Sequence, residues 1–322
     1  MKPVKIAQIG TAHDHAEFIY GSISRQDCFD VIGIAAPDGE KIDERFPGKV
    51  LSVDELLAMD DLEAVTIECA EDLATGIAIE FAKKGVAINL DKPGTADRKS
   101  FEELINIVRE KKIPFHTGYM YRYNPLVIRA MELVKSGRLG KIMSVEAQMS
   151  TLYDAKKRQW LGKYEGGMMY FLGCHLVDLV LQIMGRPEKI IPFNAKSGIA
   201  GVDVYDYGFA VLEYPSGVSF VKTMTNEVGG FERRQLVICG TEGTIEIKPF
   251  ESYFDRENIM TDALISIREN GHVTREHVNT GRFNRYDAMT RDFAECVRGK
   301  EPLYSYDYEL ELFNTVMTCA GM

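Results

Sequence analysis

Residues 4–15 read Val-Lys-Ile-Ala-Gln-Ile-Gly-Thr-Ala-His-Asp-His, an apolar run that ends in a glycine turn. A helical pattern follows near 14–23, so the stretch predicts a strand, a tight turn and a helix. This alternation continues along the first 120 residues. Short β-rich runs lie at 4–9, 30–35, 49–51, 64–68, 86–90 and 114–118, and helical patterns lie near 14–23, 40–46, 53–59, 72–84 and 97–111. Strands that alternate with helices predict βαβ units around a parallel sheet.

The central strands carry the strongest fold signal. The runs at 64–68 and 86–90 are almost continuously apolar, which is typical of strands covered by helices on both faces. We therefore predict a doubly wound α/β domain over residues 1–120.

The pattern changes after residue 120. Asn124-Pro125 is a good helix start and Gly137 a good stop. Downstream, a strand is expected at 141–149, an apolar helix at 167–184, strands at 205–214, 218–225, 234–239 and 244–248, and a final helix near 286–297. Consecutive strands joined by short glycine turns predict an antiparallel sheet. We predict a second, α+β domain over residues 121–322.

Composition narrows the functional class. The 322 residues suggest two domains, and the net charge of −10 argues against nucleic-acid binding. Residues 1–120 hold 14 basic and 22 acidic side chains, net −8. No apolar run approaches the ~18–20 residues of a membrane span, and polar residues interrupt the N-terminus too early for a signal peptide. Six scattered cysteines do not form a disulfide framework, so we expect a reduced, cytoplasmic protein.

The turn after the first strand, Gly10-Thr11-Ala12-His13-Asp14-His15, occupies the place of the G-x-G-x-x-G dinucleotide fingerprint. Only Gly10 of the three glycines is present, which makes the motif weak, although a helix N-terminus there can still bind an anion. His13 and His15 also raise a metal hypothesis, with His175 and Asp178 as further ligands. Because His-x-His on a turn is not a recognised zinc spacing, we predict no metal; both histidines either line a cleft or cap and pack the helix.

Asp91-Lys92-Pro93 directly follows the strand at 86–90. Ligands of open α/β sheets bind outside the carboxyl ends of the strands, so Lys92 can point into that crevice. The alternative is a solvated lysine at a strand end.

The apolar helix at 167–184 carries a second group of polar residues. Phe171, His175, Asp178 and Gln182 share one helical face at i, i+4, i+7 and i+11. A histidine with an aspartate one turn on suits proton transfer, because the carboxylate can fix the tautomer of the ring. The alternative is a hydrogen-bonded histidine on a buried helix.

Taken in order, these motifs resemble one family. The order is the strand–turn–helix start, Asp91-Lys92-Pro93, a segment from Gly118 through Arg122 to Pro125, the helix with His175 and Asp178, and finally Arg233-Arg234 with Gly240-Thr241-Glu242-Gly243-Thr244. The chain resembles the glucose–fructose oxidoreductase/inositol dehydrogenase (Gfo/Idh/MocA) family over essentially its whole length. The resemblance implies an N-terminal Rossmann domain that binds NAD(P), and a C-terminal α+β domain with a large, mostly antiparallel sheet. It also implies hydride exchange with sugars, inositols or related polyols, and a homodimer or homotetramer formed through that sheet.

The resemblance assigns roles to individual residues. The catalytic lysine of the family's Glu-Lys-Pro motif maps to Lys92, and the family histidine maps to His175. The cofactor-binding residues are then expected to be Gly10, Thr11, Ala12, His13, Asp38, Cys69, Glu71, Asp91, Lys92 and Pro93, and the substrate-binding residues Arg122, Tyr123, Asn124 and His175. Two departures stand out: the degraded glycine fingerprint, and Phe171 at the position where family dehydrogenases usually carry an aspartate. Glu68-Cys69-Ala70-Glu71 is a smaller one, because many relatives have an Ala-Thr-Pro-Asn type of turn there.

We therefore expect an NAD(H)-dependent oxidoreductase, with His175 as the base, Lys92 as the cation for the developing alkoxide and Asp178 orienting His175. Asp38 and Glu40 follow the second strand, and an acid there favours NAD over NADP. Two alternatives stay open. One is a sugar enzyme that oxidises its substrate transiently, eliminates a group and reduces it back. The other is a catalytically silent sugar or nucleotide sensor, which the loss of the carboxylate at Phe171 favours.

Overall fold

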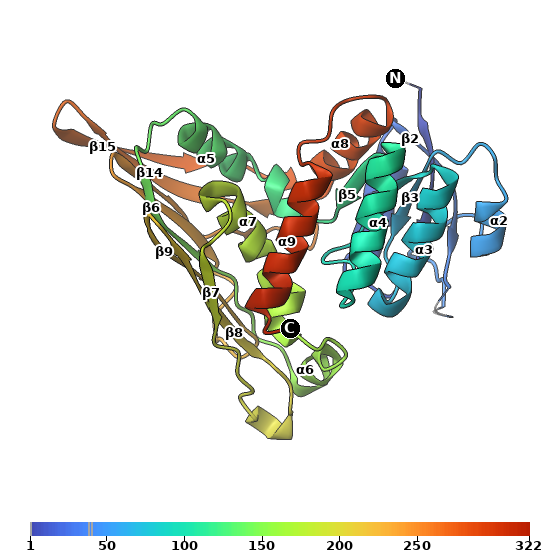
Figure 1. Cartoon of the computed structure of the whole chain (residues 1–322), viewed down its shortest axis with the longest axis horizontal. Coiled ribbons are helices and arrows are strands. Elements are labelled where there is room, and N and C mark those ends of the chain that lie inside the picture. The colour runs from blue at the N-terminus through green and yellow to red at the C-terminus, as the bar shows by residue number, and fades with distance from the viewer. Residues whose placement is uncertain (1, 38, 40) are drawn as a thin grey trace. The chain divides into compact units, whose positions relative to one another are not determined.

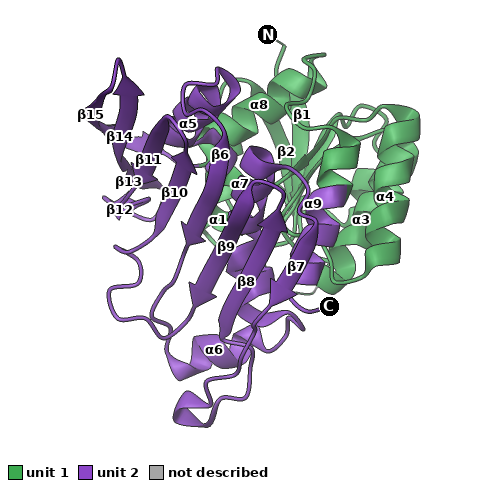
Figure 2. Cartoon of the chain, turned by 60° about the vertical axis from the view of Figure 1, so that its left-hand side comes forward, with its two compact units in different colours: residues 1–120, 286–310 green, residues 121–285, 311–322 purple. Residues whose placement is uncertain are grey.

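The computed structural model describes residues 2–37, 39 and 41–322, which form two compact units (Figures 1 and 2). The first unit holds residues 1–120 and 286–310, and the second holds residues 121–285 and 311–322. The sequence placed 286–310 in the second domain. The structure places this segment with the first unit because α8 (Asp287–Val297) packs against α1 (Ala16–Arg25), where Asp287 accepts hydrogen bonds from Ser22 at 2.7 Å and from Arg25.

A parallel five-stranded sheet forms the centre of the first unit. Its order is β2-β1-β3-β4-β5, and every neighbouring pair is parallel. The strands are β1 (Val4–Ile9), β2 (Phe29–Ala35), β3 (Ala64–Ile67), β4 (Ala87–Leu90) and β5 (Phe115–Thr117); besides α1 and α8, the helices are α2 (Val53–Leu57), α3 (Glu71–Lys84) and α4 (Arg98–Lys111). β3 and β4 are buried at every position, as expected for strands covered on both faces.

The short run at 49–51 forms a bridge rather than a full strand. Val50 pairs with Ile34 in parallel, on the free side of β2. With this bridge counted as a strand, the order becomes the 3-2-1-4-5-6 of a dinucleotide-binding sheet. The α/β prediction is therefore confirmed for the first unit.

The helix expected near 40–46 is absent among the described residues 41–46, which form a loop and a turn. Phe46 explains the difference: its side chain packs into a core cluster with Tyr20 and Ile34. A loop can deliver this single aromatic anchor to the core, so no helical face is needed.

A large, mostly antiparallel sheet dominates the second unit. Its order is β15-β14-β11-β10-β6-β9-β8-β7, and only the β6–β9 pair is parallel. The strands of this sheet are β6 (Ile142–Gln148), β7 (Lys189–Pro192), β8 (Tyr207–Tyr214), β9 (Gly217–Met224), β10 (Gln235–Gly240), β11 (Gly243–Ile247), β14 (Asp262–Glu269) and β15 (His272–Asn279). This confirms the α+β prediction for the C-terminal domain.

Shorter elements complete this unit. A three-stranded sheet contains β12 (Ser252–Tyr253), β13 (Asn258–Met260) and β16 (Phe283–Asn284). The helices are α5 (Pro125–Lys135), α6 (Ala155–Leu161) and α7 (Cys174–Met184), with a π-helical turn η2 (Met169–Gly173) before α7 and short 3-10 turns η1 (Met120–Tyr123) and η3 (Ile199–Gly201). The division between the units falls within α9 (Tyr306–Cys319).

α7 packs against β6 and β9, and each of its residues from Cys174 to Leu181 is buried. A helix that is buried all round is part of a core. His175 and Asp178 therefore lie on a buried element of the core.

All six cysteines are free, and five of them are buried. Among the residues that the structure describes, no helix is both long enough and apolar enough to cross a membrane.

Candidate active site

The turn after β1 is closed by Gly10. Its φ is +95°, and a Cβ at this position would lie 2.3 Å from the backbone N and Cα of Cys69, which follows β3. The Gly10 N–H donates to the carbonyl of Ala35 at 2.6 Å. Only glycine satisfies both the left-handed backbone and this close approach. Gly10 thus has the geometry that the first glycine of a dinucleotide turn requires.

Helix α1 begins at Ala16, shortly after this turn. Its N-cap is His15, whose side chain makes no capping hydrogen bond. The first N–H groups of a helix, together with its dipole, favour an anion. Thr11 and Ala12, which lie between Gly10 and this N-terminus, are half-buried. The segment is suited to a phosphate group.

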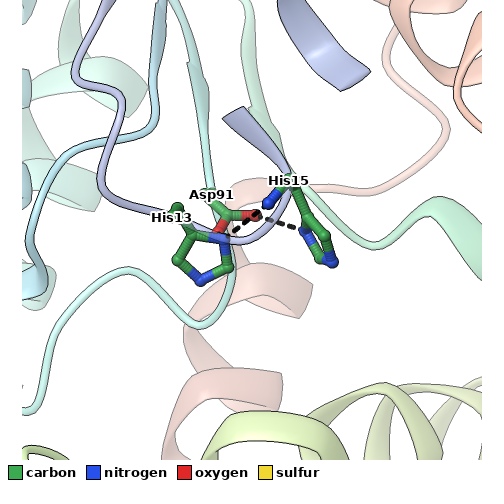
Figure 3. A group of neighbouring side chains, drawn as sticks. All are labelled: His13, His15 and Asp91. Carbon is green, nitrogen blue, oxygen red and sulfur yellow. Dashed lines mark hydrogen bonds and ion pairs between the residues drawn. The ribbon is translucent and has the colours of Figure 1, made fainter. Parts of the chain in front are cut away.

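Three side chains meet at the carboxyl edge of the sheet (Figure 3). Asp91 follows β4, and its two carboxylate oxygens contact the Nδ1 atoms of His13 and His15, the latter at 3.2 Å. The two rings lie 5.0 Å apart, edge to face. Burial opposes ionisation of Asp91, but the two imidazoles outweigh it and hold the pKa of Asp91 well below its usual range. Burial lowers the pKa of His15 to about 4, although Asp91 opposes this shift.

Glu68 adds a second buried carboxyl to this edge. It is 1% exposed and accepts a hydrogen bond from the Thr66 hydroxyl at 3.3 Å. The Asn89 amide in turn donates to this hydroxyl at 3.0 Å. Burial, and then the charge of Asp91, raise the pKa of Glu68 well above its usual range. The backbone carbonyl of Glu68 accepts from the His13 N–H at 3.1 Å. This bond ties the histidine turn to the end of β3.

Lys92 and Pro93 directly follow Asp91, and Lys92 is only 2% exposed. The solvated-lysine alternative is therefore wrong. Cys69 is buried, and Glu71 is the first residue of α3. Gly10, Cys69 and Asp91 thus lie at the carboxyl ends of β1, β3 and β4, the edge where ligands of such sheets bind. The remaining predicted cofactor residue, Asp38, lies outside the described residues.

In the second unit, His175 lies in the first turn of α7 and is 1% exposed. The ring of Tyr121 meets the His175 ring edge to face at 4.8 Å. The Tyr121 hydroxyl donates to Glu251 at 2.9 Å, and Glu251 also binds Arg234 and Arg285. Burial, and then the charge of Glu251, raise the pKa of Tyr121 well above its usual range. Tyr121 is thus a neutral ring held in place beside His175.

Asp178 has a different principal partner from the one that the sequence suggested. Its carboxylate accepts from the Arg122 guanidinium at 2.9 to 3.1 Å and from the Gln182 amide at 2.8 Å. Both members of the ion pair are buried. A carboxylate has about four acceptor positions, and these bonds occupy them. Asp178 therefore anchors Arg122, and its role in orienting His175 stays a prediction.

The helix around Phe171 also departs from the expected pattern. Residues 169–173 form a π-helical turn, so Phe171 and His175 are not related by the regular α-helical i, i+4 spacing. The Phe171 ring stacks on Tyr164 at 5.4 Å and meets Trp160 edge to face at 5.1 Å. The side chain at this position thus belongs to an aromatic cluster.

Two of the predicted substrate residues have structural partners. Asn124 caps α5 by accepting from the Leu126 N–H at 2.9 Å, and its amide donates to Thr261 at 2.8 Å. Arg122 is paired with Asp178. Both side chains are buried, whereas Tyr123 is half-buried. Their proposed contact with substrate stays a prediction.

Sequence reasoning missed the network around Glu251. Arg234 belongs to a motif that the family resemblance had already singled out, but Glu251 and Arg285 carry no local signal. They converge only because the region after β11 and the end of β16 fold against Tyr121.

Comparison with known proteins finds that the chain is similar to oxidoreductases. Residues 127–246 match the family model described as the GFO/IDH/MocA C-terminal domain. A D-xylose 1-dehydrogenase (NADP(+)) of Haloferax volcanii is 28% identical over 82% of this chain and 79% of its own length. A 2,7-anhydro-N-acetylneuraminate hydratase of Escherichia coli is 25% identical over 61% of this chain and 54% of its own length.

A solved structure extends the similarity to the whole fold. A UDP-N-acetylglucosamine 3-dehydrogenase of Acidithiobacillus ferrooxidans superimposes with a TM-score of 0.81 over 100% of this chain and 98% of its own, at 17% identity. Residues 127–246 thus match the C-terminal domain of the GFO/IDH/MocA family, the family that the motifs resemble, and the whole chain has the fold of this dehydrogenase.

Proposed function

We propose that this protein is an NAD(H)-dependent oxidoreductase that exchanges a hydride with a hydroxyl-bearing carbon of a sugar, an inositol or a related polyol. The observation that carries the proposal is the buried Lys92 after β4, at the same sheet edge as the Gly10 turn. At the ligand-binding edge of a doubly wound sheet, a lysine is placed to act on a bound substrate or cofactor.

The first unit fits a nicotinamide dinucleotide. A Cβ at Gly10 would clash with Cys69. The backbone of this turn therefore carries no side chain at the point where it passes the end of β3. The N-terminus of α1 supports the pyrophosphate through its N–H groups and its dipole. When bound, the nicotinamide supplies the hydride acceptor. Gly10, Thr11 and Ala12 would hold the phosphates, whereas the N–H of His13 donates to the carbonyl of Glu68.

The residues of the chain supply the proton chemistry. Oxidation of a secondary alcohol requires a base for the hydroxyl proton and a cation that favours the developing alkoxide. His175 is our base, because an imidazole titrates near neutral pH in its ordinary state. Lys92 is our cation. Tyr121 holds the His175 ring in one orientation through their edge-to-face contact.

The loop after β2 supports NAD over NADP. NADP requires a cation for its 2′-phosphate. Arg45 lies in this loop, but its guanidinium donates to Asp43 at 2.9 Å and lies 3.4 Å from Glu17. The arginine is thus already paired with acids. The net charge of −8 carried by residues 1–120 also disfavours the 2′-phosphate of NADP.

A second candidate function keeps the cofactor without net redox change. The similarity to a hydratase of an anhydro sugar favours it. In this second candidate function the substrate of our protein would be oxidised transiently, a group would be eliminated and the carbon would be reduced back. A third candidate, a silent sensor, rests on Phe171, which cannot exchange a proton.

The outer face of the large sheet supports a homo-oligomer. Phe209 and Phe220 stack there at 5.6 Å, and the neighbouring Phe193 is 54% exposed. We propose a homodimer or homotetramer through this face. Native mass spectrometry with and without NAD and NADP reports both the number of chains and cofactor retention.

A panel of sugars, inositols and sugar acids with NAD tests the function. We expect nicotinamide absorbance at 340 nm to change with at least one of them. Product formed at constant absorbance would establish the elimination reaction. Sugar binding by calorimetry without any product across the panel would establish the sensor.

A further inference from the structure

We propose that His13, His15 and Asp91 form a binding site for a divalent transition-metal ion. Each residue contributes one ligand atom, and these atoms lie within 4.8 Å of one another. This proposal does not depend on the redox function, since it concerns only the three side chains at the carboxyl edge of the first sheet.

The donor set fits such an ion. Two imidazole nitrogens and one carboxylate oxygen are a common ligand set for zinc, iron, cobalt and manganese, and three ligands leave positions for water or substrate. The separation of 3.2 Å between His15 Nδ1 and Asp91 Oδ1 is that of two ligands on one ion, because metal–ligand bonds of ~2.0–2.2 Å place neighbouring ligands ~3 Å apart. Figure 3 shows the two rings on either side of the carboxylate.

The tertiary fold, and not the spacing of the residues in the sequence, brings the three ligands together. His13 and His15 follow the Gly10 turn, whereas Asp91 follows β4. Gly118 makes room for the carboxylate, since a Cβ there would lie 2.8 Å from Asp91 Oδ1. The side chain of His15 is 13% exposed, which gives an ion a path to the group. A His-x-His pair on a turn becomes a three-ligand group only through this tertiary contact.

A buried carboxyl lies close to this group. Glu68 is 1% exposed, its Oε2 has no hydrogen-bond partner among the described residues, and it interacts electrostatically with Asp91 and Lys92. A divalent ion bound at Asp91 would place positive charge near this carboxyl.

A second cluster of possible metal ligands differs from the first in its charge balance. His116, Asp292 and Cys296 also lie within ligand distance of one another. There, however, the Lys300 ammonium already donates to Asp292 at 2.6 Å and supplies the positive charge. All three residues are buried. We therefore propose no metal at this second cluster, and His116 provides a matched control.

The test uses the full-length protein after treatment with a chelator. Co²⁺ is added, and binding is followed by visible absorbance and by isothermal titration calorimetry. We expect one Co²⁺ per chain, displaced by Zn²⁺, and intense visible bands that report low coordination. Asp91→Asn and His15→Gln should each weaken binding at least ~10-fold, and His116→Gln should leave it unchanged.

Absence of stoichiometric binding by the unmodified protein overturns the proposal, and so does an equal loss of affinity in His116→Gln. Thermal melts of each variant identify any that fail to fold. If Asp91→Asn does not fold, the affinity of His15→Gln for Co²⁺ decides the test. NADH binding is measured separately by fluorescence. A protein that binds NADH but no Co²⁺ refutes the metal site alone, and one that binds Co²⁺ but no nicotinamide refutes the proposed function alone.

Discussion

Tyr121 holds His175 by an edge-to-face ring contact at 4.8 Å, while its hydroxyl is bound to the buried carboxylate of Glu251. Such aromatic contacts are worth ~0.5–1.5 kcal/mol beyond the area that they bury. Arg234 and Arg285 fix Glu251 in turn. The orientation of the candidate base is thus set by a chain of contacts that reaches β10 and the end of β16.

Replacement of His175 by asparagine should lower kcat by about 10²–10⁴-fold, the usual effect of losing a general base. The change in KM should be far smaller, because the interaction belongs to the transition state. Steady-state kinetics with the substrate found in the panel provide the measurement. His272→Asn, on the exposed strand β15, is the control. A kcat within ~3-fold of the unmodified enzyme would make His175 a structural residue, with Tyr123 as the next candidate for the base.

Replacement of Lys92 by methionine should remove most of the turnover and leave the fold intact. Methionine fills a similar buried volume without the charge, so the melting temperature should change little. Lys99→Met, at an exposed position of α4, should change neither property. Paired thermal melts and rates test this prediction. Unchanged turnover in Lys92→Met would show that the buried ammonium has a purely structural partner.

NAD should bind at least ~10-fold more tightly than NADP, a difference of ~1.4 kcal/mol. The reason is the pairing of Arg45 with Asp43 and Glu17. Asp43→Asn should therefore narrow the ratio by freeing Arg45 for a 2′-phosphate, whereas Asp54→Asn on α2 should not. Fluorescence titration with NADH and NADPH measures both affinities. Equal or tighter binding of NADPH by the unmodified protein would reverse the assignment.

Replacement of Glu251 by glutamine should cost about 3–5 kcal/mol of the free energy of unfolding at pH 7, because two buried guanidinium groups lose their carboxylate. Burial opposes ionisation of Glu251, but Arg285 and Arg234 outweigh it and lower its pKa. A carboxylate with a lowered folded-state pKa stabilises the protein above its unfolded-state pKa of ~4.3. This contribution is lost as the pH falls through the lower folded-state value.

The stability difference between the Glu251→Gln variant and the unmodified protein should therefore be constant near neutral pH and shrink below about pH 4. Urea unfolding across the acid range measures it. Glu276→Gln, which removes an exposed partner of Arg129 at 2.6 Å, should cost less than ~1 kcal/mol. A cost for Glu251→Gln as small as this control would show that the network carries little stability.

The sequence by itself determined the parts of the protein that depend on local pattern. Apolar runs and glycine turns are local, so β3, β4 and the Gly10 turn could be located from residue type and spacing alone. The Asn124-Pro125 helix start is equally local, and the structure shows Asn124 capping α5. The family motifs likewise placed Lys92 directly after a buried strand and His175 on a buried helix, as the structure shows for β4 and α7.

Tertiary structure alone decided the partners of the charged groups. Asp178 pairs with Arg122, 56 residues earlier in the chain, as well as with Gln182 on its own helix. Asp91 meets His13 and His15 across the sheet edge, and Glu251 gathers Tyr121, Arg234 and Arg285 from separate segments. Local pattern encodes which face of an element is buried, but the desolvation of a charge is offset only by whichever opposite charge the complete fold brings within a few ångströms.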